Sequence, residues 1–334
     1  MSNLSCSEPA VFCGIDVSAA TLAVAVQPNQ QREFANTAAG HKQLIAWLHK
    51  LGPARVSLEA TGIYSLDLAL ALDAAPGIEC QVLNPKAVHR FAQTLRRSKT
   101  DKADALTLAE YSQRMPFVAW RPPSRAALRL RAIGRHIESL SVQRVRDHNR
   151  LHAGEGSAST PRCVIQDLRR SLQAQDKRIR ALRRQAVVLV RQDATLSQQF
   201  ELLTAMPGIA LISALHLLGE LAALPAGLSV RQWVAHSGLD PAHCVSGASV
   251  ARPSKISRAG SRHLRRALYM PALVAARRDP HFTAFYQTLL ARHKAKLQAL
   301  IAVARKMLHA IFGIFKHQQP YKGAILFPNL LPTS

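Results

Sequence analysis

The chain has 334 residues, of which Lys and Arg contribute 44 and Asp and Glu 20, so its net charge is +24. This length exceeds one average domain and predicts two or three. The apolar fraction of 48% can bury a sizeable core, which excludes a disordered basic tail. A charge this large indicates a polyanionic partner, most frequently nucleic acid and next a membrane surface.

The positive charge is concentrated in the later two thirds of the chain. Residues 1–120 carry 11 basic and 10 acidic side chains, residues 121–240 carry 18 and 9, and residues 241–334 carry 15 and 1. The first segment is therefore nearly neutral, and the basic surface is expected after it.

The cysteines and the N-terminus indicate a cytoplasmic protein. The five cysteines are odd in number and include no CxxC pair, which disfavours a zinc ribbon or a disulfide framework. No basic segment followed by an apolar one opens the chain, so no signal peptide is predicted. The longest uncharged run, 202–219, is broken by Pro207-Gly208 and predicts two buried helices rather than a membrane span.

In chain order, the first 121 residues show strand patterns and then alternating strands and helices. Strands are predicted over two parts of 11–27 and over 32–36, 55–59 and 79–83. Helices are predicted over 41–51, 65–74, 86–95 and 101–114. This order indicates a mixed sheet flanked by helices, an α/β domain over residues 9–121.

The rest of the chain reads as helical. Residues 122–197 predict two long helices, 124–152 and 163–192, separated by a Gly- and Ser-rich break. Leu168, Leu172, Ile179 and Leu182 have roughly heptad spacing, which suggests a helical hairpin or coiled coil. The alternative is a solvated basic helix face. Residues 198–325 predict a third, mostly helical domain.

Four acidic residues of the first domain stand out by position. Asp16 lies inside an apolar strand, Glu59 ends another, and Asp101 and Asp104 share one face of a predicted helix. Four carboxylates meeting at one place would repel each other unless divalent cations lay between them. Mg²⁺, or Mn²⁺ in its place, prefers such ligands, and a pair of ions is the usual clamp for phosphodiester chemistry.

Other interpretations of these acids stay open. A strand Asp can cap a turn, and Asp101 can serve only as the N-cap of its helix. The start Gly14-Ile15-Asp16-Val17 also suits actin-like sugar-kinase ATPases, but no later glycine-rich phosphate or adenosine loop follows it.

Residues 237–271 predict a loop rich in hydroxyls and bases, followed by a helix that begins near Ser261. Helix-terminal amides and basic side chains form a phosphate-binding surface, expected here from Arg252, Lys255, Arg258, Arg262, Arg265 and Arg266. Ser246 among these cations is a candidate covalent nucleophile. The alternatives are that Ser246-Gly247 is only a turn, or that Cys244 is the nucleophile.

Residues 203–219 have a helix, Pro-Gly, helix pattern. The pattern resembles a helix-hairpin-helix, whose turn amides hold a backbone phosphate, although Ala210 stands where a second glycine is usual. The alternative is a buried pair of antiparallel helices.

A set of short motifs occurs in a fixed order between about residues 11 and 320. The motifs are Gly14-Ile15-Asp16, Glu59-Ala60-Thr61-Gly62, Asn84-Pro85, Lys99-Thr100-Asp101 with Asp104-Ala105, Pro207-Gly208-Ile209, Ser246-Gly247-Ala248-Ser249, and Leu264-Arg265-Arg266 with Tyr269-Met270-Pro271-Ala272. In this order they resemble the DEDD transposases, or recombinases, of bacterial insertion sequences, in the family numbered 110.

The resemblance implies an RNase H-like first domain of the RuvC type, with Asp16, Glu59, Asp101 and Asp104 as metal ligands. It implies a coiled coil for dimerisation and RNA binding, then a transposase domain whose Ser246 attaches covalently to DNA. The implied partners are donor and target DNA, a structured bridge RNA that guides the reaction, and further copies of the chain, as a dimer or a tetramer. No membrane is implied, and the protein is expected at the bacterial nucleoid when it acts.

The sequence therefore predicts an enzyme, an RNA-guided DNA recombinase that uses Mg²⁺ and a phosphoserine intermediate. One alternative is a RuvC-like nuclease or junction resolvase in which water attacks the phosphate. The other is a catalytically inactive relative that only binds nucleic acid.

Overall fold

The computed structural model divides the chain into two units, Met1–Pro122 and Pro123–Ser334. It describes residues 11–28, 30–60, 62–95, 100–246 and 250–328, without the side chains of 101, 102 and 243–254. The first unit ends one residue after the predicted boundary at 121. The predicted segments 122–197 and 198–325 lie together in the second unit.

The first unit is built on one mixed sheet with the strand order β3-β2-β1-β4-β5. Its strands are β1 (Val11–Val17), β2 (Thr21–Val26), β3 (Gln30–Ala35), β4 (Ala54–Glu59) and β5 (Ile78–Leu83). β1, β2 and β3 pair antiparallel in succession, whereas β1, β4 and β5 are parallel. The predicted α/β class is confirmed, and the arrangement is compatible with an RNase H-like domain.

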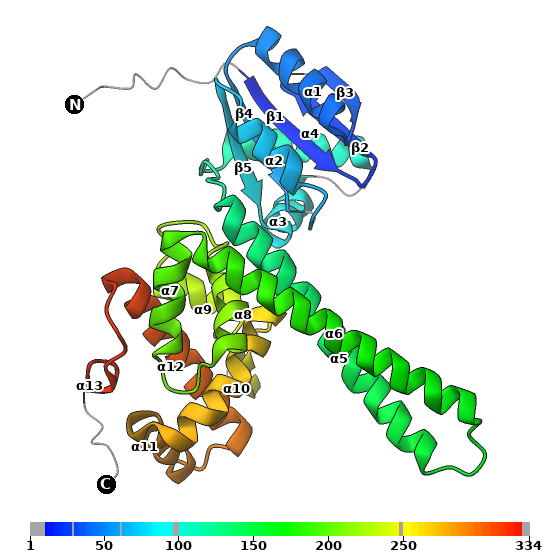
Figure 1. The fold of residues 1–334 in the computed structure, drawn as a ribbon. Coiled ribbons are helices and arrows are strands. Elements are labelled where there is room, and N and C mark those ends of the chain that lie inside the picture. Colours follow the sequence, from blue (N-terminus) through cyan, green and yellow to red (C-terminus); the bar gives the residue numbers. More distant parts are fainter. Residues whose placement is uncertain (1–10, 29, 61, 96–99, 247–249, 329–334) are drawn as a thin grey trace. The chain divides into compact units, whose positions relative to one another are not determined.

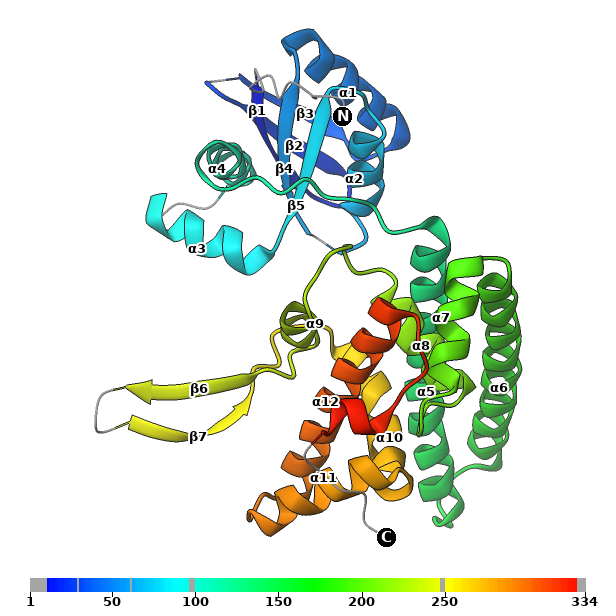
Figure 2. The ribbon, with the colours of Figure 1, turned by 90° about the vertical axis from the view of Figure 1, so that its left-hand side faces the viewer.

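Helices cover both faces of this sheet (Figure 2). They are α1 (Ala38–Leu51), α2 (Leu66–Asp73), α3 (Pro85–Leu95) and α4 (Asp101–Arg114). On one face, α1 and α2 bury Leu44, Leu48, Leu68 and Leu72 against alternate residues of the strands. Burial of such side chains stabilises the unit by roughly 1.5–3 kcal/mol each. On the other face, α4 packs across β1, β2 and β4.

The second unit begins with two long helices, α5 (Arg125–Glu155) and α6 (Arg162–Arg191), which run side by side in opposite directions (Figure 1). The buried seam of α6 consists of Gln175, Ile179, Ala186 and Val190. Its spacing of four and seven residues keeps the seam on one helix face. The predicted helical hairpin is therefore confirmed, with ends within three residues of those predicted.

The remaining helices surround a single large apolar core. They are α7 (Ala194–Thr204), α8 (Leu211–Leu221), α9 (Val230–Ser237), α10 (Arg262–Arg278), α11 (Pro280–Ala291), α12 (Lys296–His317) and α13 (Gly323–Leu326). Among the described helices, α12 alone is long and apolar enough to cross a membrane by length and composition, and half of that stretch is buried. Val303, Met307 and Ile311 of α12 are fully buried in this core.

The prediction of a loop before α10 is wrong, because the segment forms a β-hairpin. Its strands are β6 (Pro241–Ser246) and β7 (Val250–Ile256), which pair antiparallel. Pro241 and Pro253 lack a donor for the strand ladder, and they are tolerated because both strands of a two-stranded sheet are edges. The abundance of Ser, Gly and Pro concealed these strands at the level of sequence.

Candidate functional site

Asp16 and Glu59 lie at the carboxyl ends of two adjacent parallel strands. In the register of β1 and β4, Ile15 is opposite Leu58, and the next residues along the two strands are Asp16 and Glu59. Ile15 and Leu58 are fully buried in the core beneath α1 and α2. Because side chains alternate along a strand, Asp16 and Glu59 are directed to the opposite face, which α4 covers.

Gly14 allows α4 to approach this face closely. A Cβ atom on Gly14 would collide with the backbone of Ala105 and Ala109 of the helix. Ala105 and Ala109 form a small core with Ala25, which pairs with Gly14 across the sheet. Small side chains on both elements thus bring the helix backbone onto the strands that carry the two carboxylates.

The direction of α4 sets the position of the other two acids. Near the end of the helix, the Ser112 hydroxyl donates to the Arg55 carbonyl at the start of β4, at 3.2 Å. Ala105, near the other end, packs beside Ala25 and Ala23, and Ala23 pairs with Asp16. The helix therefore runs from the carboxyl ends of the strands towards their amino ends, and its first turn, with Asp101 and Asp104, lies at the Asp16 end.

The start of α4 is fixed by a side-chain cap. The Thr100 hydroxyl accepts a hydrogen bond from the Ala103 amide at 3.2 Å. Thr100 is therefore the N-cap, which disfavours the interpretation of Asp101 as the cap residue. The helix N-terminus carries partial positive charge, which favours acidic residues in the first turn.

The four acids offer a donor set of carboxylate oxygens, which suits Mg²⁺ or Mn²⁺. Asp16, Glu59 and Asp104 are half-buried, and the Asp101 side chain lies outside the described residues. Among the described side chains, no group of three or more His, Cys, Asp or Glu is placed to hold a metal ion. The backbone thus brings the four positions to one end of the sheet, and their joint coordination stays a prediction.

Asn36 joins the two loops that follow Asp16 and Glu59, and sequence reasoning missed it. Its Nδ2 donates to the Ser18 carbonyl at 2.8 Å and to the Tyr64 carbonyl at 3.1 Å. Its Oδ1 accepts from Nε2 of His41 at 2.8 Å. Burial lowers the pKa of His41, although the charge of Asp67 opposes that shift. No motif marks Asn36, because its partners come from distant parts of the sequence.

Ser246 is the last residue of β6 and pairs with Val250 of β7. Its side chain and that of Cys244 lie outside the described residues, as do residues 247–249. At the base of the hairpin, the Ser257 hydroxyl donates to Asp240 Oδ1 at 2.6 Å, and the Ser257 amide donates to the Asp240 carbonyl at 2.8 Å. The hairpin is thus anchored to the unit at its base.

The six predicted phosphate-binding residues fall into different environments. Lys255, Arg258 and Arg262 are exposed, and the side chain of Arg252 lies outside the described residues. Arg265 instead donates to the Ser237 carbonyl at 2.8 Å and to the Gly260 carbonyl at 3.2 Å. Arg265 therefore ties the end of α9 to the turn before α10. Arg266 donates to Glu138 Oε1 at 3.2 Å.

A buried carboxylate, Glu220 of α8, joins three helices and was not singled out in the sequence. It is 6% exposed and accepts from Arg135 Nε at 2.6 Å, from Arg135 Nη2 at 3.0 Å and from the Ser261 hydroxyl at 2.9 Å. Burial alone would raise the pKa of Glu220, but the hydrogen bonds from Arg135 and Ser261 and the positive charges lower it below its ordinary value. Glu220 thereby fixes the start of α10 against α5.

The predicted helix-hairpin-helix corresponds to α7, a turn and α8. Gly208 in the turn has a φ of +87°, which favours glycine. The turn packs directly on α10, because a Cβ on Gly208 would meet the Pro271 carbonyl. Ile209 and Met206 beside it are buried, so this side of the turn belongs to the core.

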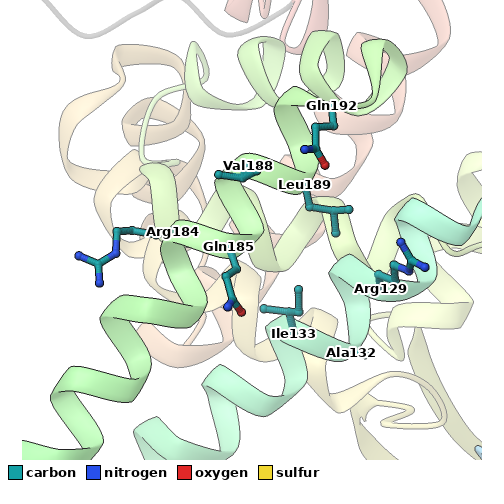
Figure 3. A pocket seen from close by; sticks show the side chains of 8 residues that line it. All are labelled: Arg129, Ala132, Ile133, Arg184, Gln185, Val188, Leu189 and Gln192. Atoms are coloured by element: carbon teal, nitrogen blue, oxygen red, sulfur yellow. The ribbon is translucent and has the colours of Figure 1, made fainter.

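An open apolar groove of about 540 Å³ lies between α5 and α6 (Figure 3). Ile133, Val188 and Leu189 line it, with Arg129 and Arg184 among the other lining residues. None of its eight lining residues carries a carboxylate or a hydroxyl, so the groove offers neither a carboxylate ligand for a metal ion nor a hydroxyl nucleophile.

Two family models match the chain. Residues 13–154, from β1 to the end of α5, match a transposase model of the DEDD type. Residues 200–287, from α7 to α11, match the model of the transposase IS116/IS110/IS902 family.

Relatives along the whole chain agree with these models. The chain is 27% identical to the pilin gene-inverting protein of Moraxella bovis and 28% identical to that of Moraxella lacunata. Each alignment spans 323 residues, which are 94% of this chain and 98% of the relative. A 163-residue alignment at 28% identity joins 48% of this chain to 38% of a 43.6 kDa protein of insertion element IS110 from Streptomyces coelicolor. The chain therefore carries the transposase domains of the IS110 family of insertion sequences.

Proposed function

We propose that this protein is an RNA-guided DNA recombinase that cleaves and exchanges strands through a covalent phosphoserine intermediate. The observation that supports it most is the position of α4, whose first turn lies at the strand ends that carry Asp16 and Glu59. This arrangement gathers four carboxylate-bearing positions at one end of one sheet. The matches to transposase models favour DNA as the substrate.

Asp16, Glu59, Asp101 and Asp104 would hold the divalent cations, the first two from strands and the last two from α4. When bound, Mg²⁺ or Mn²⁺ supplies the positive charge that stabilises a phosphodiester under attack. The tight contact of α4 with β1 at Gly14 would keep the two pairs of ligands at a fixed separation.

Ser246 would act as the nucleophile. Its hydroxyl oxygen forms a bond to the scissile phosphorus while the bond from that phosphorus to the leaving DNA oxygen breaks. The serine proton is lost, and the leaving oxygen is protonated to a free hydroxyl. A hydroxyl of the second duplex then attacks the phosphoserine, restores a phosphodiester and releases Ser246. One phosphate ester replaces another at each step, so the exchange needs no ATP.

A structured guide RNA, the bridge RNA of this family, would pair with donor and target DNA. The protein would then recognise backbone and shape, as the excess of 33 basic over 10 acidic side chains in residues 121–334 favours. The active assembly would be a homodimer or a tetramer at the nucleoid, in which the carboxylates of one chain can meet the serine of another.

Three variants test the chemistry. Ser246→Ala should abolish strand exchange and the covalent adduct on a suicide DNA substrate, whereas Cys244→Ala should retain both. Asp16→Asn should abolish cleavage but leave nucleic-acid binding nearly intact. Cleavage at the wild-type rate by Ser246→Ala, without an adduct, would instead identify a nuclease that uses water.

The guide is tested separately by sequencing the RNA that co-purifies with the full-length protein. A discrete RNA with two internal loops supports guided exchange. Random cellular RNA contradicts the guide but leaves the serine chemistry standing.

A further inference from the structure

A charged recess of about 680 Å³ lies between α5 and the start of α10. Four arginines line it, Arg135 and Arg146 from α5 and Arg262 and Arg266 from α10. Glu138 is the one carboxylate among the lining residues, and Ser139 and Gln143 add neutral hydrogen-bonding groups. The sequence could not reveal this recess, because its two walls are more than a hundred residues apart.

Part of the charge in the recess is balanced by fixed ion pairs. Arg135 is held by the buried carboxylate of Glu220. Glu138 lies 2.6 Å from His263 Nδ1 and accepts from Arg266 Nη1 at 3.2 Å. Glu138 is only 14% exposed, so these contacts form a fixed wall of the recess.

Arg146 and Arg262 are the two cations that this wall leaves uncompensated. Both line the recess and are exposed, and neither has an ion-pair partner within the described part of the chain. Arg262 is also the first residue of α10, where the partial positive charge of the helix N-terminus adds to that of the guanidinium. The recess therefore presents two unpaired positive charges that can bind an anion.

The form of the recess favours a phosphodiester. Guanidinium groups present donors in a planar fork that matches phosphate oxygens. The volume exceeds that of one inorganic phosphate and suits a nucleotide-sized segment of a strand. Because Arg146 and Arg262 are exposed, a strand can reach them from solvent.

We infer that this recess binds a backbone phosphate of a nucleic-acid strand through Arg146 and Arg262. The inference rests on the proposed function. It assigns part of the basic surface which that function needs to one site with two direct contacts. Only five residues separate the end of β7 from Arg262, so a strand held here is fixed beside the base of the Ser246 hairpin. The recess would thus set the register of that strand relative to the hairpin.

The test compares two full-length double variants. Arg146→Gln with Arg262→Gln removes both free cations of the recess. Arg125→Gln with Arg277→Gln removes the same charge from exposed positions on the same two helices, outside the recess. Each protein also carries Ser246→Ala and is measured without divalent ions, so binding is independent of cleavage and of the proposed nucleophile.

Binding to a labelled random-sequence duplex and to a labelled single-stranded RNA is measured by fluorescence anisotropy over a range of salt concentrations. If the recess makes two phosphate contacts, the variant with Arg146→Gln and Arg262→Gln should respond less to salt than the protein without them. The slope of log binding constant against log salt concentration should become shallower by about 1.8 on duplex DNA or about 1.4 on RNA. The affinity of this variant should fall about tenfold or more, while the control variant stays within about twofold. A change on DNA alone or on RNA alone identifies the strand, and equal losses in both double variants, or none, overturn the inference.

A variant that removes a negative charge from the recess, and so should have the opposite effect on binding, extends the test. Glu138→Gln removes the carboxylate from the recess while its amide oxygen still accepts from Arg266, so binding should tighten by about twofold or more. A Glu138→Gln protein that melts like the wild type but binds more weakly would contradict a phosphate in the recess.

Discussion

Gly14 is a single residue on which the geometry of the carboxylate face depends. It stands opposite Ala25 in the sheet and beneath Ala105 and Ala109 of α4, where any Cβ would collide with helix backbone. Backbone cannot move aside as a flexible side chain can, so a substitution must displace the helix that carries Asp101 and Asp104.

Gly14→Ala should lower the free energy of unfolding by about 1–3 kcal/mol and reduce DNA cleavage further than that loss explains. Gly313→Ala in α12 is the matched control, because nothing lies within 4 Å of the added Cβ. It should be neutral or stabilise by up to about 1 kcal/mol, since alanine is the better helix former. Urea unfolding measures both, and equal midpoints for Gly14→Ala and the wild type would refute the close contact.

At the same scale, Glu220 makes stability depend on pH. Its pKa in the folded protein is lowered from 4.5, so its contribution is present above that value and is lost as the pH falls below it. Glu220→Gln should cost about 2 kcal/mol at neutral pH, because the hydrogen bonds from Arg135 and Ser261 then lose a charged acceptor. When the free energy of unfolding is measured against pH, it should fall less for the variant than for the wild type below pH 4.5. Parallel curves would exclude Glu220 as a source of acid sensitivity.

Among the elements, the α5–α6 hairpin carries a polar cluster in its apolar seam. Asp147 is 5% exposed and accepts from Gln175 Nε2 at 2.6 Å and from the Ser171 hydroxyl at 3.2 Å. Buried polar pairs of this kind cost stability when one member is removed, and they can fix the register of two helices. The cluster therefore fixes the register between α5 and α6.

Asp147→Ala should destabilise the protein by about 1–3 kcal/mol, because the Ser171 hydroxyl loses its acceptor and Gln175 keeps only that hydroxyl as an acceptor in a buried place. Asp176→Ala removes a carboxylate from the same hairpin, but that group is 44% exposed and pairs with Arg144 at the surface. Its effect should stay within about 0.5 kcal/mol. Hydrogen exchange of the hairpin amides distinguishes the two, and equal protection in both variants would argue against a role for the buried cluster.

For the whole molecule, net charge should govern non-specific binding to nucleic acid. The chain carries +24, nearly all of it in residues 121–334. Its affinity for random duplex DNA should fall about 10³-fold or more between 50 and 200 mM salt, because neutralised phosphates release counterions. Anisotropy titrations measure this slope. An affinity that hardly responds to salt would show that the basic side chains do not contact the backbone.

The sequence predicted the mixed sheet, the helices of the first domain and the two long helices to within a few residues. It did so because period-2 and period-3.6 patterns and Pro-Gly breaks are local signals. It missed the β6–β7 hairpin, where Ser, Gly and Pro mask the strand pattern.

By itself, the sequence determined most of the secondary structure, because the patterns that predict it depend on residues close together in the chain. It also determined the uneven charge and the ordered motifs that resemble those of transposases, which need no folding to be seen. Only the tertiary structure decided that α4 runs back along β1 and β4, so that its acids begin at the Asp16 end. It also decided that Asn36 joins two loops and that α5 and α10 enclose an arginine-lined recess. The reason is physical, because these relations depend on the packing of small residues and buried ion pairs between distant segments, which no local pattern encodes.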